Sequence, residues 1–144
     1  MLRYLLILIL STSFGAMSMV ETQFYDNYVN SESVIKTKSG LLYKILRKGD
    51  GDVSPTVTQV VTVNYEGKLT DGKIFDSSYE RGVPAKFGVN QVIPGWVEGL
   101  QLMHVGDEFE FVIPPELAYG ANGVPGVIPP NSILIFKVSL ISIS

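Results

Sequence analysis

A regular alternation of apolar and polar residues along several stretches of the chain is the feature that most constrains its fold. Apolar side chains alternate in residues 57–65 at Val57, Val61, Val63 and Tyr65, with Gln59 between them, and in residues 108–113 Phe109, Phe111 and Ile113 alternate against Glu108 and Glu110. A period of two puts successive side chains on opposite faces of a strand. The Asp71-Gly72 pair marks a tight hairpin turn after the first of these stretches. The sequence predicts strands over residues 41–47, 57–65, 73–76, 108–113 and 132–143.

One segment between the predicted strands has helical periodicity. Residues 94–102 begin with Pro94, which suits the first turn of a helix, and place Trp96, Leu100 and Met103 on one side. A sheet with one long apolar face needs cover, and this helix can provide it. The pattern therefore predicts an α+β domain in which an antiparallel sheet wraps against a single short helix.

The N-terminus has the order of a secretory signal peptide. Arg3 precedes an apolar run over residues 4–10, and small and polar residues follow it. We expect a signal peptide over residues 1–18, cleaved after Ser18, with cleavage after Gly15 as the competing site. If the segment stays uncleaved, it would act as a membrane anchor. Residues 19–39 are expected to form a short helical or disordered lead-in, and residues 40–144 to form the domain.

Residues 116–131 have no periodic pattern, although they contain many apolar side chains among glycines and prolines. A loop of this length in a small domain is usually functional. We expect its apolar side chains to line a pocket or flap beside the sheet. For Tyr119 and Ile128 a pocket position is favoured over a core position, and for the other apolar residues the two are equally expected.

The sequence lacks the residues that most enzymes use for covalent or metal chemistry. It contains no cysteine, a single histidine (His104) and none of the common hydrolase, phosphate-binding or dinucleotide-binding motifs. The net charge is −3 and the basic residues form no long run, which argues against nucleic-acid binding. We expect no metal, no cofactor and no nucleic acid. Any reaction would have to depend on the shape of an apolar site and on the exclusion of water from it.

Five motifs follow one another along the domain: VNYEG at 63–67, GKIFDSS at 72–78, QVIPGW at 91–96, AYG at 118–120, and IPPN at 128–131 with LIF at 134–136. In this order and spacing the chain resembles the FKBP-type peptidyl-prolyl cis-trans isomerases over residues 40–143. The segment YERGVPA at 79–85 and the QVIPGW motif resemble the exported bacterial branch of the macrophage infectivity potentiator type. The resemblance implies a bent antiparallel sheet around one short α-helix. It also leads us to expect a monomer, because only about twenty residues precede the domain where that branch commonly carries a dimerisation region.

The resemblance also implies the site residues, motif by motif. Trp96 would form the floor on which a proline ring rests. The backbone N–H of Ile93 and the hydroxyl of Tyr119 would bond the flanking peptide carbonyls, and Asp76 would orient polar groups at the rim with Arg81 or Tyr65. The chain differs from some members at Ala85, Gln91 and Val124. The implied catalytic residues are Tyr65, Phe75, Asp76, Tyr119 and Phe136, and the implied substrate-binding residues are Val92, Ile93, Trp96, Ile128, Arg81 and Phe87.

An apolar pocket suits the isomerisation of the X-Pro bond. Amide resonance sets a barrier of about 18–20 kcal/mol, and twisting the bond removes the resonance together with its charge separation. A dry aromatic cavity therefore disfavours the planar amide more than the twisted one. The expected function is isomerase activity on unfolded or exported proline-containing polypeptides, in a periplasm, extracellular space or secretory lumen. Macrolides of the tacrolimus or rapamycin type are possible inhibitors. A non-catalytic chaperone using the same pocket is the alternative, and a small-molecule carrier is the weaker one.

Overall fold

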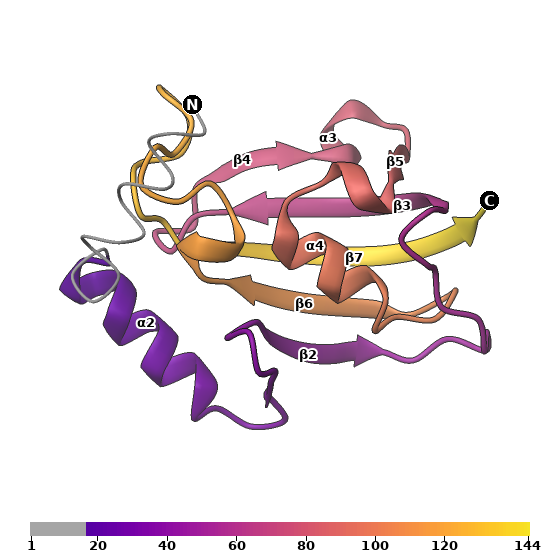
Figure 1. The fold of residues 1–144 in the computed structure, drawn as a ribbon, viewed down its shortest axis with the longest axis horizontal. Coiled ribbons are helices and arrows are strands. Elements are labelled where there is room, and N and C mark those ends of the chain that lie inside the picture. The colour runs from indigo at the N-terminus through magenta and orange to yellow at the C-terminus, as the bar shows by residue number, and fades with distance from the viewer. Residues whose placement is uncertain (1–16) are drawn as a thin grey trace.

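One antiparallel sheet organises residues 17–144, the part of the chain that the computed structural model describes (Figure 1). Its strands pair in the order β1-β2-β6-β7-β3-β4, and β5 also pairs with β3. The α-helices of this part are α2 (Met19–Val29), α3 (Ser78–Arg81) and α4 (Pro94–Leu100), and two short 3-10 helices are η1 (Val89–Gln91) and η2 (Pro115–Leu117). The strands are β1 (Ile35–Lys36), β2 (Leu42–Arg47), β3 (Val60–Lys68), β4 (Ile74–Ser77), β5 (Ala85–Gly88), β6 (Glu108–Ile113) and β7 (Leu134–Ile143). The predicted α+β class is confirmed.

The predicted strands are found with shifted ends, and two short strands were missed. β3 begins at Val60 rather than at residue 57, because a turn closed by bonds between Thr56 and Gln59 precedes it. The prediction of strand at residues 132–133 and of helix at residues 101–102 was also wrong, since β7 begins at Leu134 and α4 ends at Leu100. β1 and β5 have two and four residues, which is too short for a periodic pattern to reveal.

The larger core lies between the sheet and α4. Alternate residues of each long strand point into it, including Val61 and Val63 of β3 and Phe111 of β6, all of which are almost completely buried. Trp96 and Leu100 of α4 pack against them. The expectation that the Trp96 helix covers the apolar face of the sheet is confirmed, and Figure 1 shows α4 lying across the strands.

A smaller core lies on the opposite face of the sheet, under α2. The intervening residues Leu42, Val112, Ile133 and Ile135 form this face, because successive side chains of a strand alternate between faces. The lead-in was expected to be either a short helix or disordered. It contains the helix α2, whose aromatic residues cover this second apolar face. The residues of α2 that do so are Phe24, Tyr25, Tyr28 and Val29.

Candidate active site

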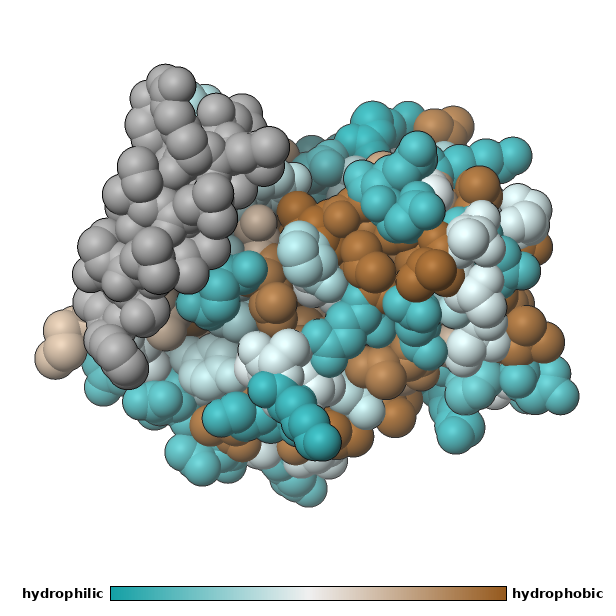
Figure 2. Space-filling view, viewed as in Figure 1, coloured by the Kyte–Doolittle hydropathy of each residue, from teal (hydrophilic) through white to brown (hydrophobic). Residues whose placement is uncertain are grey.

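An apolar cavity of about 430 Å³ opens beside α4, bounded by β3, β4, β7 and the long loop before β7. Apolar surface gathers over α4 on the face shown in Figure 2. All lining residues except Gln91 were expected as site residues from the sequence. The cavity is lined by Tyr65, Asp76, Phe87, Gln91, Val92, Ile93, Trp96, Tyr119 and Phe136.

Trp96 is the centre of an aromatic cluster in this cavity. The Trp96 ring lies edge-on to Tyr65, Phe87 and Phe136, with centroid distances of 5.2, 5.5 and 5.2 Å and interplanar angles of 90°, 82° and 86°. Edge-to-face packing is a favourable arrangement for aromatic pairs. Only 4% of Trp96 is exposed, so three rings hold the indole in one orientation. It forms a rigid apolar floor.

Two glycines of α4 bring Trp96 close to the sheet. A Cβ on Gly95 would lie 2.6 Å from the Ile113 side chain, and a Cβ on Gly99 would lie 2.6 Å from the ring of Phe111. These residues are one helical turn apart and face β6 together. Their lack of side chains lets the helix approach the strand directly. Pro94 and the Ile93 carbonyl start the helix, and Ile93 accepts bonds from the amides of Trp96 and Val97.

A third glycine, Gly67 of β3, makes room for the aromatic wall. A Cβ there would lie 2.5 Å from the Phe136 ring and 2.8 Å from the Phe75 ring. Both rings therefore lie across the backbone of β3, edge-to-face with a centroid distance of 5.5 Å. Phe136 faces the cavity, whereas Phe75 stands behind it and is absent from the cavity wall.

The polar part of the site is a triangle of Tyr65, Asp76 and Arg81. The Tyr65 hydroxyl donates to Asp76 Oδ2 at 2.6 Å, and Arg81 donates to Asp76 Oδ1 at 2.6 Å and to the Tyr65 oxygen at 2.9 Å. Burial, followed by the hydrogen bond to Asp76, raises the pKa of Tyr65. Bonds to Asp76 and Tyr65 likewise raise the pKa of Arg81. Asp76 was expected to orient polar groups at the rim with Arg81 or Tyr65, and the structure places it in hydrogen-bond contact with both.

Ser78, which is fully buried at the start of α3, holds the backbone of Tyr65 in place. Its hydroxyl accepts from the Tyr65 amide at 2.8 Å and donates to Asn64 Oδ1 at 2.9 Å. Ser77 caps α3 by accepting from the Glu80 amide. The short helix is thereby joined to β3, and Arg81 in its last position reaches Tyr65.

Tyr119 reaches the cavity from the long loop. Backbone bonds from Gly120 to Pro115 and from Asn131 to Gly120, both 2.9 Å, close the base of this loop. Tyr119 is 39% exposed, and partial burial of its side chain together with the negative charge of Asp76 raises its pKa. The hydroxyl therefore stays protonated at neutral pH and can donate a hydrogen bond to a carbonyl.

Three of the implied site residues lie outside the cavity wall. Ile128, for which a pocket position was favoured, is 5% exposed and packs in the larger core. Phe75 supports Phe136 from behind, and Arg81 lies at the rim. Conversely, Gln91 lines the cavity but was not assigned to the site, although it begins the QVIPGW motif. Its position directly before the expected site residues Val92 and Ile93 could have identified it as a site residue.

The cavity offers aromatic faces and a few oriented polar groups. Within residues 17–144, no three histidine, aspartate or glutamate side chains gather in a way that would hold a metal ion. His104 lies in the turn before β6, with Nδ1 3.6 Å from Asp107 Oδ2, and does not line the cavity. The arrangement can bind an apolar ring on Trp96 while donating a hydrogen bond from Tyr119.

Comparison with known proteins defines the class. Residues 51–141 match the family model described as FKBP-type peptidyl-prolyl cis-trans isomerase. The chain is 54% identical over 114 residues to the peptidyl-prolyl cis-trans isomerase Mip of Coxiella burnetii, covering 79% of this chain and 49% of that protein. This chain therefore belongs to the FKBP-type peptidyl-prolyl cis-trans isomerase family.

The relatives place it more narrowly in the Mip/FkpA branch of that family. Its fold matches the crystal structure of FkpA from Escherichia coli with a TM-score of 0.83 at 43% identity, covering 87% of this chain and 58% of that one. A peptidyl-prolyl cis-trans isomerase structure from Pseudomonas syringae matches with a TM-score of 0.81 at 37% identity, covering 87% and 91%. The chain spans about half the length of the curated relatives it matches.

Proposed function

We propose that this chain is a peptidyl-prolyl cis-trans isomerase that acts on unfolded or exported proline-containing polypeptides. The observation that carries the proposal is the Trp96 floor, which is held edge-on by three aromatic rings and lines the same cavity as the Tyr119 donor. A proline ring is apolar and matches the floor, while the adjacent peptide carbonyls need a donor. Membership of the family and the names of its relatives support the same activity.

The residues of the cavity would accelerate rotation by favouring the twisted amide. Trp96, Phe136 and Phe87 exclude water from the X-Pro bond, which raises the free energy of the polar planar amide relative to the less polar twisted state. The Tyr119 hydroxyl would bond a carbonyl flanking the proline. The triangle of Tyr65, Asp76 and Arg81 would present a fixed polar edge to the rotating carbonyl. No nucleophile or proton transfer is required.

An NMR exchange or protease-coupled assay on a proline tetrapeptide tests the proposal. We expect acceleration over buffer, and we expect Tyr119→Phe to lose part of it while the fold is kept. If the wild-type protein binds the peptide without accelerating it, the chain is a non-catalytic chaperone that uses the same cavity. If it neither binds nor accelerates, the proposal fails. A tacrolimus- or rapamycin-type macrolide is expected to compete for the cavity.

We also propose that the protein is exported. The predicted signal peptide lies almost entirely outside the described residues, and no helix within residues 17–144 is long and apolar enough to cross a membrane. Ser18 is the N-cap of α2 and accepts a 3.2 Å bond from the Glu21 amide. This role favours cleavage at the competing site after Gly15, because cleavage after Ser18 would remove the cap. An uncleaved anchor is the alternative.

We propose that the exported chain is a monomer. The apolar face of α2 is already used against the sheet, so this helix has no second apolar stripe with which to pair with another copy. Light scattering after size-exclusion chromatography tests this, and a mass twice that of the chain would contradict it.

A further inference from the structure

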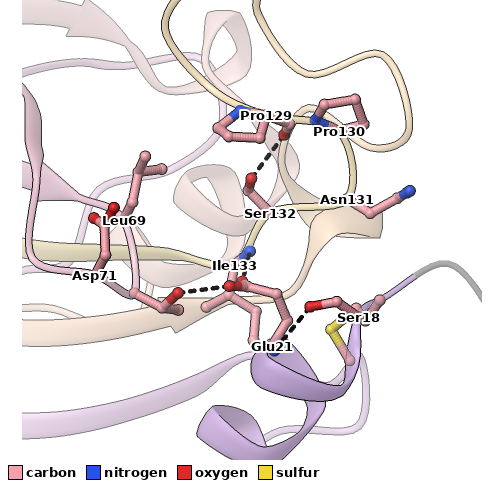
Figure 3. A pocket seen from close by; sticks show the side chains of 11 residues that line it. Ser18, Glu21, Leu69, Asp71, Pro129, Pro130, Asn131, Ser132 and Ile133 are labelled. Carbon is pink, nitrogen blue, oxygen red and sulfur yellow. Dashed lines mark hydrogen bonds between the residues drawn. The ribbon is translucent and has the colours of Figure 1, made fainter.

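Helix α2 meets the domain through one carboxylate as well as through its apolar face. Glu21 Oε2 accepts the backbone N–H of Ile133 at 2.7 Å, and Oε1 accepts the hydroxyl of Thr70 at 2.5 Å. Figure 3 shows the Glu21 side chain beside Ile133, close to Ser18, which caps the helix. We name this set of two bonds the Glu21 clip.

The Ile133 N–H needs an acceptor that the sheet does not provide. Ile133 is completely buried, and it precedes β7, whose pairing with β6 begins at Leu134 opposite Ile113. A buried amide without a partner is costly, and a carboxylate is a stronger acceptor than a neutral oxygen. Glu21 therefore satisfies a backbone group at a point where the long loop ends.

Both partners of the clip belong to segments that lead into the cavity wall. Ile133 lies two residues after Asn131, whose amide bonds to the carbonyl of Gly120, the neighbour of Tyr119. Thr70 lies in the turn between β3 and β4, and β4 carries Asp76. One side chain of α2 thus bonds to the bases of two segments that each carry a polar group of the cavity wall, Tyr119 and Asp76.

We propose that Glu21 is a positioning residue for the cavity, acting through the bases of the two segments that carry Tyr119 and Asp76. The proposal rests on the function proposed above for the cavity. Glu21 lies in the segment that the sequence assigned to a lead-in outside the domain, and it contributes no atom to the cavity wall. On this proposal, helix α2 belongs to the isomerase domain and helps to position its cavity wall.

The test compares Glu21→Ala with Ser18→Ala in the mature protein. Ser18→Ala weakens the same helix at its cap but leaves both bonds of the clip in place. Glu21→Ala is expected to raise the Kd for a proline-containing peptide, measured by calorimetry, roughly threefold to tenfold, the effect of one or two net hydrogen bonds. It should also speed hydrogen exchange at the Ile133 and Gly120 amides. Ser18→Ala should change neither Kd nor Gly120 exchange.

Glu21→Gln serves as the rescue variant, because its amide oxygen can still accept the Ile133 N–H. We expect it to restore most of the affinity. If Glu21→Ala does not fold, Thr70→Val removes one bond of the clip and leaves the helix intact, and it should weaken peptide binding in the same direction.

Two results would overturn the proposal. One is an unchanged Kd and unchanged exchange at Gly120 in Glu21→Ala. The other is an equal effect of Ser18→Ala, which would show that only the stability of the helix matters. Hydrogen exchange does not depend on isomerase turnover. If the wild-type protein has no isomerase activity, the proposed function fails, but exchange at the Gly120 amide still tests whether Glu21 holds the loop.

Discussion

The hydroxyl of Tyr65 donates a 2.6 Å hydrogen bond to Asp76, and this bond joins the aromatic floor of the cavity to its charged rim. Tyr65 is 3% exposed and packs edge-on against Trp96, whereas the side chain of Asp76 is 41% exposed and pairs with Arg81. The position of the rim therefore depends on a residue of the core.

Replacing Asp76 by asparagine is expected to lower kcat/KM about tenfold, because it removes a charge-assisted bond to Tyr65 and the ion pair with Arg81. The free energy of unfolding should change by less than about 1 kcal/mol, since the Asp76 and Arg81 side chains are both substantially exposed. The protease-coupled assay and urea unfolding measure the two effects. Asp71→Asn in the neighbouring turn is the matched control and should be neutral. Equal kcat/KM values for the two variants would show that Asp76 has no role in the reaction.

Replacing Trp96 by phenylalanine is expected to separate binding from stability. The buried indole N–H has no hydrogen-bond partner in residues 17–144, so its removal relieves a cost of about 1–3 kcal/mol that offsets the lost packing of the larger ring. Unfolding free energy should therefore change by no more than about 1.5 kcal/mol, while peptide affinity falls several-fold. Calorimetric titration and urea unfolding test this. A large loss of stability would show that the ring serves mainly the core.

Replacing Gly67 by alanine is expected to disturb both stability and activity. The new Cβ would lie within 2.5 Å of Phe136 and 2.8 Å of Phe75, and neither ring can move without displacing the cavity wall. Overpacking of this kind costs about 1–3 kcal/mol. Gly88→Ala in β5 is the matched control for stability, since the atoms nearest to its Cβ would belong to the flexible side chain of Gln91. Chemical unfolding should show a loss for the first variant and little change for the second.

Between pH 7 and about pH 9 the tyrosines are expected to leave stability unchanged, and stability should fall above pH 10, the ordinary pKa of tyrosine. Burial raises the pKa of Tyr25, Tyr28, Tyr65 and Tyr119 in the folded protein. In alkali the unfolded chain therefore binds fewer protons than the folded one, and deprotonation favours unfolding. Urea titrations between pH 7 and 11 measure the slope. Tyr28→Phe should make the decrease of the unfolding free energy with pH shallower. An unchanged slope would contradict the assignment of this decrease to the buried tyrosines.

The mature N-terminus is expected at Ala16. Intact-mass measurement of the exported protein should give a chain that keeps Met17 and the Ser18 cap, and a chain beginning at Met19 would contradict this. Substituting Ser18 by alanine should destabilise the protein by about 1 kcal/mol through loss of the cap. The conservative Ser18→Thr, which can still accept the Glu21 amide, is the control.

Much of the sheet and most of the cavity followed from the sequence, because both leave local signals. Period-two alternation located the long strands, and the five dense motifs contain every residue of the cavity wall except Phe87. Gln91 lies in a motif but was not assigned to the site. The prediction favoured a pocket position for Ile128. In a glycine- and proline-rich loop, no local sequence feature distinguishes an apolar residue that lines a pocket from one that packs in the core. The burial of Ile128 is decided by contacts with distant strands.

The role of α2 could not be predicted for a related reason. Its apolar residues are few and scattered, and they match an apolar face that exists only after β2, β6 and β7 have paired. The sequence shows apolar residues on this second face at Ile135 of β7 and at Ile133 just before it, but no local feature identifies the segment that covers them. The Glu21 bonds join residues 49 and 112 positions apart, which no spacing rule reaches.

The edge-on cage around Trp96 has a practical consequence. Trp96 is the sole tryptophan of the sequence, and it forms the floor of the cavity. Its fluorescence therefore comes from one place, and a ligand that enters the cavity should alter the emission without any added label. The same signal should report the loss of the larger core on unfolding, so one optical probe can follow both occupancy and denaturation.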